Sequence, residues 1–269
     1  MSNGICLIAQ NNSDTNYIRQ AYALALSVLS NSPDTNISLI TDDKVPYDVF
    51  DKVIPIPWGD MSYNNWKIEN RWKVYHATPY TNTIVFDVDM LVLDPIDFIW
   101  PNVHELAFTN TVTTYRNELI TDKYYRQTFE ENNLPDIYSG MYQFKKCTNA
   151  HAFFVLLDLI MRNWRVFYEK YAPKKMQNWC SVDVSIAIAL KILGIEGNAL
   201  NKNSALSFTH MKPKIQNTQH LLTKWTDSLP VDFGEKGLYI NGYKQSGVLH
   251  YVEDNFLTND VIKWLEEKV

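Results

Sequence analysis

The stretch TIVFDVDMLVLDPI, residues 83–96, places two carboxylates inside an otherwise apolar run. The run predicts a strand with its continuation, and side chains two residues apart in a strand point to the same face. Asp87 and Asp89 are therefore expected to converge at the carboxyl end of a buried strand. Because converging carboxylates repel each other, a cation between or beside them is the expected compensation. A solvated turn with two exposed aspartates is the alternative interpretation.

Strands and helices are predicted to alternate before this stretch. Three short apolar runs predict strands: ICLIA (5–9), ISLITDD (37–43) and VIPIP (53–57). Residues 17–31 carry apolar side chains at helical spacing, with Ser13 or Asp14 as the cap, and a Trp-rich helical stretch covers residues 65–77. This alternation is typical of a mostly parallel, doubly wound sheet in an α/β protein.

The second half of the chain has a looser pattern. Its interpretable segments are IYSGMYQFKK (137–146), a long helix over 152–171, a second helix over 181–193 and a late strand, GVLHYV (247–252). The sequence contains no internal repeat or linker-like composition break. We therefore expect one domain over residues 1–269, with an elaborated C-terminal half.

Composition bounds the class of protein. The 269 residues are 46 % hydrophobic, which is enough for a substantial core. The N-terminus lacks the residue order of a signal peptide, and no segment is apolar and long enough to span a bilayer, so we expect a soluble, cytoplasmic protein. Cys6, Cys147 and Cys180 are an odd number without CxxC spacing, which favours free thiols in a reducing compartment over disulfides or a zinc site.

Charge is unevenly distributed although the net charge is only -5. Residues 1–110 hold 6 Lys/Arg against 13 Asp/Glu, residues 111–224 hold 15 against 9, and residues 225–269 hold 4 against 8. The basic middle third indicates either an ordinary solvated surface or an anionic acceptor or ligand. Its basic residues include Arg116, Lys123, Arg126, Lys145, Lys146, Lys174, Lys175, Lys212 and Lys214.

Residues 71–97, RWKVYHATPYTNTIVFDVDMLVLDPID, resemble a segment of the GT-A fold nucleotide-sugar glycosyltransferases, especially glycosyltransferase family 8 and glycogenin. That family has a basic residue about sixteen positions before an Asp-x-Asp in an apolar strand, and Arg71 occupies this place. ICLIAQNNSDTNY resembles the nucleotide-holding strand and loop, YSGMYQFKK the segment along the donor sugar, and GVLHY the late metal-binding His segment. The resemblance spans residues 5 to about 255 and covers enzymes of phage and bacterial type.

The resemblance implies a fold, a metal and a donor site. The fold would be a Rossmann-like, mostly parallel sheet with a nucleotide-binding half (1–110) and an acceptor-binding half (111–269). Mn²⁺ or Mg²⁺ would be held by Asp87, Asp89 and His250 and would bridge the diphosphate of a nucleotide sugar, with a UDP-sugar expected. The implied donor-binding residues are Ala9, Asn11, Tyr17, Arg71, Asp87, Val88, Asp89, Ser139, Gly140 and Lys212. Arg71 and Asp183 are the implied catalytic residues, and transfer would occur with retention.

Several of these residues have other interpretations. Arg71 also fits a surface ion pair, Tyr17 a core position at the start of its helix, and Asp183 a carboxylate that complements a helix dipole. His210, in FTHMKPK (208–214), competes with His250 for the third metal ligand. The chain also departs from the family pattern, because Tyr138 stands where Asn is usual and the Gly-x-x-Lys-Pro-Trp segment after the late His is absent.

Two rival functions fit parts of the sequence. A haloacid dehalogenase type phosphatase also has an apolar strand ending in Asp-x-Asp, although it expects Thr or Val where Leu91 stands and its motif in the first strand. A non-enzymatic carbohydrate-binding protein is suggested by 8 Trp and 16 Tyr. For a transferase, the sequence does not identify the acceptor. Lipopolysaccharide, a teichoic-type polymer and a hydroxymethylated base in nucleic acid (DNA) fit an anionic acceptor, and a protein or another glycan, such as an oligosaccharide, is equally open.

Overall fold

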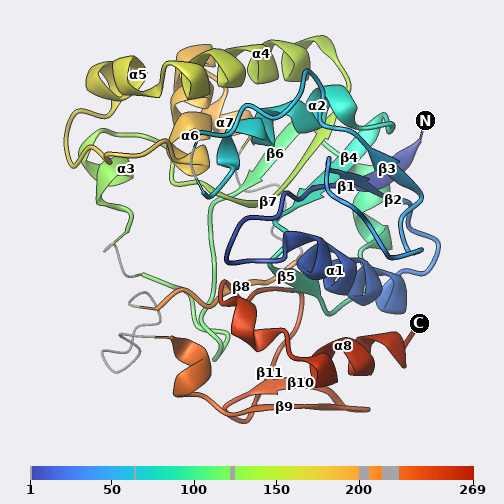
Figure 1. The fold of residues 1–269 in the computed structure, drawn as a ribbon. Coiled ribbons are helices and arrows are strands. Elements are labelled where there is room, and N and C mark those ends of the chain that lie inside the picture. The colour runs from blue at the N-terminus through green and yellow to red at the C-terminus, as the bar shows by residue number, and fades with distance from the viewer. Residues whose placement is uncertain (1, 64, 122–124, 200–205, 214–223) are drawn as a thin grey trace.

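The computed structural model describes residues 2–63, 65–121, 125–199, 206–213 and 224–269. A six-stranded sheet forms its centre (Figure 1). In spatial order the strands are β3 (Lys52–Ile54), β2 (Ile37–Ile40), β1 (Asn3–Ile8), β4 (Asn82–Phe86), β7 (Tyr138–Lys145) and β6 (Leu106–Thr109). The first four are parallel neighbours, and β7 runs antiparallel between β4 and β6. The prediction of a mostly parallel α/β sheet is confirmed.

Helices cover both faces of this sheet. They are α1 (Tyr17–Asn31), α2 (Val74–Ala77), α3 (Gln127–Glu131), α4 (Thr148–Arg162), α5 (Trp164–Tyr171), α6 (Val182–Leu193), α7 (Glu196–Ala199) and α8 (Asn259–Glu266). Strand alternation divides the core between the two faces: Ile5 and Leu7 of β1 pack with α1, whereas Cys6 packs with α4 and α6. Within the described ranges, none of the helices has the length and apolar character needed to cross a bilayer.

The apolar run that carries the aspartates is not one continuous strand. Strand β4 ends at Phe86, residues 87–89 form a bend, and β5 (Met90–Val92) joins a second sheet. That sheet has the order β5-β12-β8, with β12 (Val248–His250) and β8 (Phe208–His210) from the C-terminal half. The prediction of one extended strand is wrong here because the two halves of the run pair in different sheets, β4 with β1 and β7, and β5 with β12. The aspartates therefore lie at the junction of two sheets.

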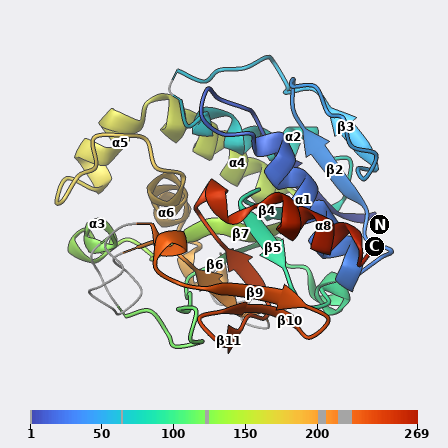
Figure 2. The ribbon, with the colours of Figure 1, turned by 60° about the horizontal axis from the view of Figure 1, so that its bottom comes forward.

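The remaining C-terminal elements pack on α1. A three-stranded sheet of β9 (Val231–Gly234), β10 (Gly237–Ile240) and β11 (Tyr243–Lys244) lies next to α8. Helix α8 runs beside α1 in both views (Figures 1 and 2), and the Tyr22 hydroxyl donates to Glu266 at 2.9 Å. The C-terminal helix of the chain thus packs against its first helix.

Three local predictions are corrected by the structure. Asn16, not Ser13 or Asp14, caps α1, because its side chain accepts from the amide of Arg19. The predicted helix over 152–171 breaks at Asn163, whose side chain donates to the carbonyl of Leu159 and ends α4 there. The Trp-rich stretch over 65–77 forms a 3₁₀ helix (Ile68–Lys73) followed by α2.

Candidate active site

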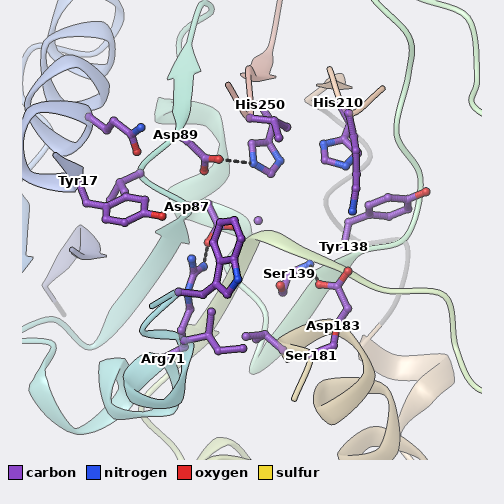
Figure 3. A pocket seen from close by; sticks show the side chains of 18 of the residues that line it. Tyr17, Arg71, Asp87, Asp89, Tyr138, Ser139, Ser181, Asp183, His210 and His250 are labelled. Atoms are coloured by element: carbon purple, nitrogen blue, oxygen red, sulfur yellow. Dashed lines mark hydrogen bonds and ion pairs between the residues drawn. The ribbon is translucent and has the colours of Figure 1, made fainter. Parts of the chain in front are cut away.

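A cavity of about 930 Å³ opens where the two sheets meet (Figure 3). The residues that line it belong to the carboxyl ends of β1 and β4, the start of β7, the N-terminus of α6 and the β5-β12-β8 sheet. Ligands of open α/β sheets bind at this carboxyl edge. The residues predicted from the sequence that line it are Ala9, Tyr17, Arg71, Asp87, Val88, Asp89, Ser139, Gly140, Asp183, His210, Lys212 and His250.

Each of the two aspartates has its own cationic or hydrogen-bonding partner. The Arg71 guanidinium forms an ion pair with Asp87, and His250 Nε2 lies 3.0 Å from Asp89 Oδ2. Burial raises the pKa of Asp89, but His250 and Arg71 outweigh it and hold that pKa below its usual value. The Asp89 carboxylate is therefore held in its charged form although only 22 % of its side chain is exposed, and Asp87 beside it exposes 15 % of its side chain.

The donor set fits a divalent metal. One ligand atom each from Asp87, Asp89 and His250 lies within 4.8 Å of the other two. Two carboxylates and an imidazole suit Mn²⁺ and comparable divalent ions, and three protein ligands leave positions for a substrate. Among the residues that the structure describes, this is the group of acidic, His and Cys side chains that has metal-site geometry.

His210 lies beside His250 but faces a different environment. The two residues are direct neighbours on the parallel strands β8 and β12, with ring centroids 4.7 Å apart. His210 is buried, and burial, His250 and nearby cations lower its pKa well below the usual value. The ligand atoms that converge with the two aspartates belong to His250, and His210 forms the wall behind it (Figure 3).

The loop after β1 supplies the opposite wall. Ala9 and Tyr17 line the cavity, and Figure 3 shows Tyr17 on the side away from Tyr138 and Asp183. Burial, followed by the nearby Asp89, raises the pKa of the Tyr17 hydroxyl. Asn11 is not among the lining residues: its side chain accepts from the Ile18 amide and its own amide donates to Asp43. Asn11 therefore fixes the conformation of this loop through hydrogen bonds and does not itself face the cavity.

The start of β7 runs directly beneath the aspartates. The Asp87 amide donates to the Gly140 carbonyl at 2.8 Å, which fixes the bend after β4 to β7. A Cβ on Gly140 would lie 2.3 Å from Met90 Cε and 3.2 Å from Phe208 Cζ. Glycine at position 140 thus allows β7 to approach β5 and β8 closely.

Gly140→Ala is expected to destabilise the protein by about 1–3 kcal/mol, because Met90 is fully buried and overpacking costs roughly this much. Urea unfolding measures the loss, and adding Met90→Val should recover part of it by removing the clashing methyl group. Gly197→Ala in α7 is the control, since no atom lies within 4 Å of a Cβ there. Equal stability of the two alanine variants would contradict the predicted clash.

Asp183 closes the cavity from the first turn of α6, which begins at the Ser181 cap. Its Oδ1 accepts from the Ser139 amide at 2.9 Å and its Oδ2 from Arg126 Nη1 at 3.0 Å. Ser139 precedes Gly140 in the segment that was predicted to contact the donor sugar. The carboxylate therefore does more than complement the helix dipole, because it joins α6 to β7.

The described part of the basic middle third does not make the cavity cationic. Among the described residues, five basic and five acidic side chains line it: Lys67, Arg71, Arg126, Lys212 and Lys224, and Asp87, Asp89, Asp183, Glu253 and Asp254. The Lys212 ammonium lies 4.0 Å from the centroid of the Tyr125 ring, and burial lowers its pKa. Lys123 and Lys214 lie outside the described residues.

Some lining residues were not predicted from the sequence. They include Gln10, Trp66, Trp179, Ser181 and Lys224. Arg126 also lines the cavity, and it was named from the sequence only among the basic residues of the middle third. Trp66 and Trp179 are 73 % and 54 % exposed, an unusual state for so large an apolar side chain. Neither lies in a motif, so only the three-dimensional arrangement identifies them.

Comparison with known structures identifies the fold of this chain. No protein-family model and no curated protein matches the chain. The galactosyltransferase LgtC, solved in complex with donor and acceptor sugar analogs, matches with a TM-score of 0.55 and 15 % identity over 98 % of this chain and 93 % of LgtC. This chain has the GT-A glycosyltransferase fold.

A second GT-A protein has a similar structure. The glycosyltransferase GlyE from Streptococcus pneumoniae TIGR4 matches with a TM-score of 0.50 and 11 % identity, over 100 % of this chain and 60 % of GlyE. The GT-A fold predicted from the sequence is thereby confirmed. At these identities the likeness concerns the fold, so the chemistry has to be argued from the site.

Proposed function

We propose that this protein is a metal-dependent glycosyltransferase that moves a sugar from a nucleoside-diphosphate sugar to an acceptor hydroxyl. The observation that carries the proposal is the convergence of Asp87, Asp89 and His250, with Arg71 beside them, in the main cavity of a GT-A fold. A UDP-sugar is the proposed donor and Mn²⁺ or Mg²⁺ the proposed metal.

Asp87, Asp89 and His250 would hold the metal, which supplies Lewis-acid stabilisation of a leaving diphosphate. Arg71 reaches the same place from the 3₁₀ helix Ile68–Lys73 and is paired there with Asp87. A guanidinium at this position would stabilise the negative charge that grows on the leaving diphosphate, more strongly in the transition state than in the ground state. Tyr17 and Ala9 would bound the nucleoside, with the Tyr17 ring available for stacking.

The sugar would lie between the metal site and α6. Ser139, Gly140 and Asp183 line that part of the cavity, and Lys212 is a further candidate for a phosphate contact. If family 8 is the right relative, transfer proceeds with retention, and an oxygen of the donor's own phosphate takes the acceptor proton. The proposed acceptor is a hydroxyl group of a glycan, of lipopolysaccharide or of a hydroxymethylated DNA base.

The proposal is tested by thermal unfolding of the protein with UDP, GDP, CDP or ADP, each with and without Mn²⁺. A ligand that binds only the native state raises the Tm. Stabilisation that requires one nucleotide together with the metal is the expected result. No shift with any combination would contradict the proposal and favour the phosphatase, which is tested with phosphate monoesters, or the carbohydrate-binding protein, which is tested with glycans.

The third ligand is tested by comparing His250→Ala with His210→Ala. His250→Ala should weaken Mn²⁺ binding by more than the roughly 10–100-fold that is typical of losing a group that only orients a ligand. His210→Ala should cost less, because His210 lies behind His250 and outside the converging set. Titration with Mn²⁺, followed by the electron paramagnetic resonance signal of the free ion, measures both affinities. A larger loss of Mn²⁺ affinity in His210→Ala than in His250→Ala would make His210, not His250, the third metal ligand.

A further inference from the structure

Arg126 is a buried arginine at the wall of the cavity. It is 7 % exposed, and its guanidinium lies between the rings of Phe129 and Tyr138, 4.1 Å from each centroid. Asp136 forms an ion pair with it, and the Ile137 carbonyl accepts a hydrogen bond from it. The guanidinium is thus held on both faces and along its edge, which leaves it little freedom to move.

One arm of this guanidinium is directed at Asp183. Arg126 Nη1 donates to Asp183 Oδ2 at 3.0 Å, while Oδ1 of the same carboxylate accepts from the Ser139 amide. Both oxygens of Asp183 are therefore engaged, on opposite sides, by donors from two other segments of the chain. About a quarter of the side chain stays exposed, and Asp183 lines the cavity (Figure 3).

A carboxylate held in this way has a defined chemical use. Each oxygen has roughly two acceptor sites, so one on each remains for a ligand. Because Arg126 and the Ser139 amide already occupy a lone pair on each oxygen, this carboxylate suits accepting further hydrogen bonds from hydroxyl groups better than attacking a carbon atom. A sugar is the hydroxyl-rich part of the proposed donor.

We propose that Arg126 is a positioning residue that holds Asp183 as a fixed acceptor for hydroxyl groups of the donor sugar. This inference rests on the proposed glycosyltransferase activity. It assigns Arg126 no contact with the reacting atoms: the residue acts through Asp183. Without the guanidinium, the carboxylate would lose the donor that sets its rotation. Its bond from the Ser139 amide would then be weaker, and the sugar would be held less precisely.

Arg126→Met tests the proposal because methionine fills most of the same space between the two rings without donating hydrogen bonds. Binding of UDP with Mn²⁺ should stay within about twofold of wild type, whereas kcat/KM for hydrolysis of UDP-glucose or UDP-galactose, whichever the wild type uses, should fall by about 10²-fold, as for a misplaced substrate. Arg126→Lys, which restores one charged donor, should recover part of the loss.

The matched control is Arg162→Met, because Arg162 is also paired with a carboxylate, Asp158, and also lies over an aromatic ring, that of Trp72. It does not line the cavity, so its kinetics should match wild type. The double variant Arg126→Met/Asp183→Asn should be no slower than Asp183→Asn alone, since a positioning residue acts only through its partner. Additive losses, or equal losses in Arg162→Met, would overturn the proposal.

A second readout needs no turnover. Hydrogen exchange of the Ser139 amide in the ligand-free protein should be faster in Asp183→Asn and Arg126→Met and unchanged in Arg162→Met, because Asp183 accepts the bond that protects this amide. Wild-type protection in Arg126→Met would overturn the positioning role. If exchange responds as expected but the wild type releases UDP from no sugar nucleotide, either in water or with glycan and hydroxymethylated DNA acceptors, the proposed function has failed and the inferred sugar contact fails with it.

Discussion

Replacing Asp89 by Asn is expected to reduce metal-dependent sugar transfer by about 10³-fold or more. The loss of one metal ligand removes several kcal/mol of charge stabilisation, and each 1.4 kcal/mol corresponds to a factor of ten in rate. The fold should survive, because Asn Oδ1 can still accept from His250, and the Asp89 carbonyl keeps its bond from the Tyr251 amide. Turnover at saturating Mn²⁺ and the Tm are the measurements.

Asp94→Asn is the matched control for this experiment. Asp94 belongs to the same apolar run, but its carboxylate accepts from the Gly247 amide at 2.7 Å and lies outside the main cavity. The control should lower the Tm without changing the response to Mn²⁺. Turnover by Asp89→Asn at the wild-type rate would refute the assignment of a metal site to the Asp-x-Asp pair.

Arg71→Ala is expected to have opposite effects on two ligands. In the ligand-free protein Arg71 neutralises Asp87, so its removal should strengthen binding of Mn²⁺ alone. The same removal should lower kcat/KM for a UDP-sugar by about 10²–10³-fold, because a donor to the leaving diphosphate is lost. Mn²⁺ titrations without nucleotide and steady-state kinetics with it separate the two effects.

Arg71→Lys serves as the conservative comparison. A lysine keeps the charge but not the planar, multiple-donor geometry, so its kinetics should fall between those of the wild type and Arg71→Ala. If both variants bind Mn²⁺ and turn over the donor as the wild type does, Arg71 is a surface ion-pair residue, as one interpretation of the sequence allowed.

The sequence predicted the fold class because the signals that define it are local. The apolar runs at β1 and β2 and the helical spacing of α1 lie where residues 5–9, 37–43 and 17–31 were predicted to form these elements. The Asp-x-Asp pair was predicted to hold a cation by chemistry alone, since two converging carboxylates in an apolar run require compensation. The two residues that supply this compensation are far from the pair in sequence: Arg71 lies 16 positions before Asp87, and His250 lies 161 positions after Asp89. They were predicted to meet the aspartates from the family resemblance, not from the spacing.

Other features depend on contacts that no local pattern encodes. The bend at residues 87–89 exists because β5 pairs with β12, a strand more than 150 residues later. At the break, the carbonyl of Leu159 accepts from both the backbone amide and the side chain of Asn163. Arg126 lies in a segment without clear periodicity, and its importance follows from the simultaneous proximity of Asp136, Tyr138 and Asp183.

Tyr138 links a departure in sequence to the structure of the site. The resemblance to family 8 expects Asn at this position, where it would contact the sugar. Here the Tyr138 ring instead covers the guanidinium of Arg126, which in turn holds Asp183. Tyr138, which departs from the family pattern, therefore helps to hold Arg126 and Asp183 in the same part of the cavity.

The central claim is that the Asp87, Asp89 and His250 group and a nucleotide sugar together carry out chemistry. The most direct measurement is release of UDP from a panel of UDP-sugars by the wild-type protein, with Mn²⁺ and again after chelation by EDTA. UDP release from at least one sugar nucleotide is expected, and this release should be lost on chelation and restored by added Mn²⁺. Binding of UDP and Mn²⁺ without release of UDP from any donor, in the presence of glycan and hydroxymethylated DNA acceptors, would contradict it and favour a binding protein.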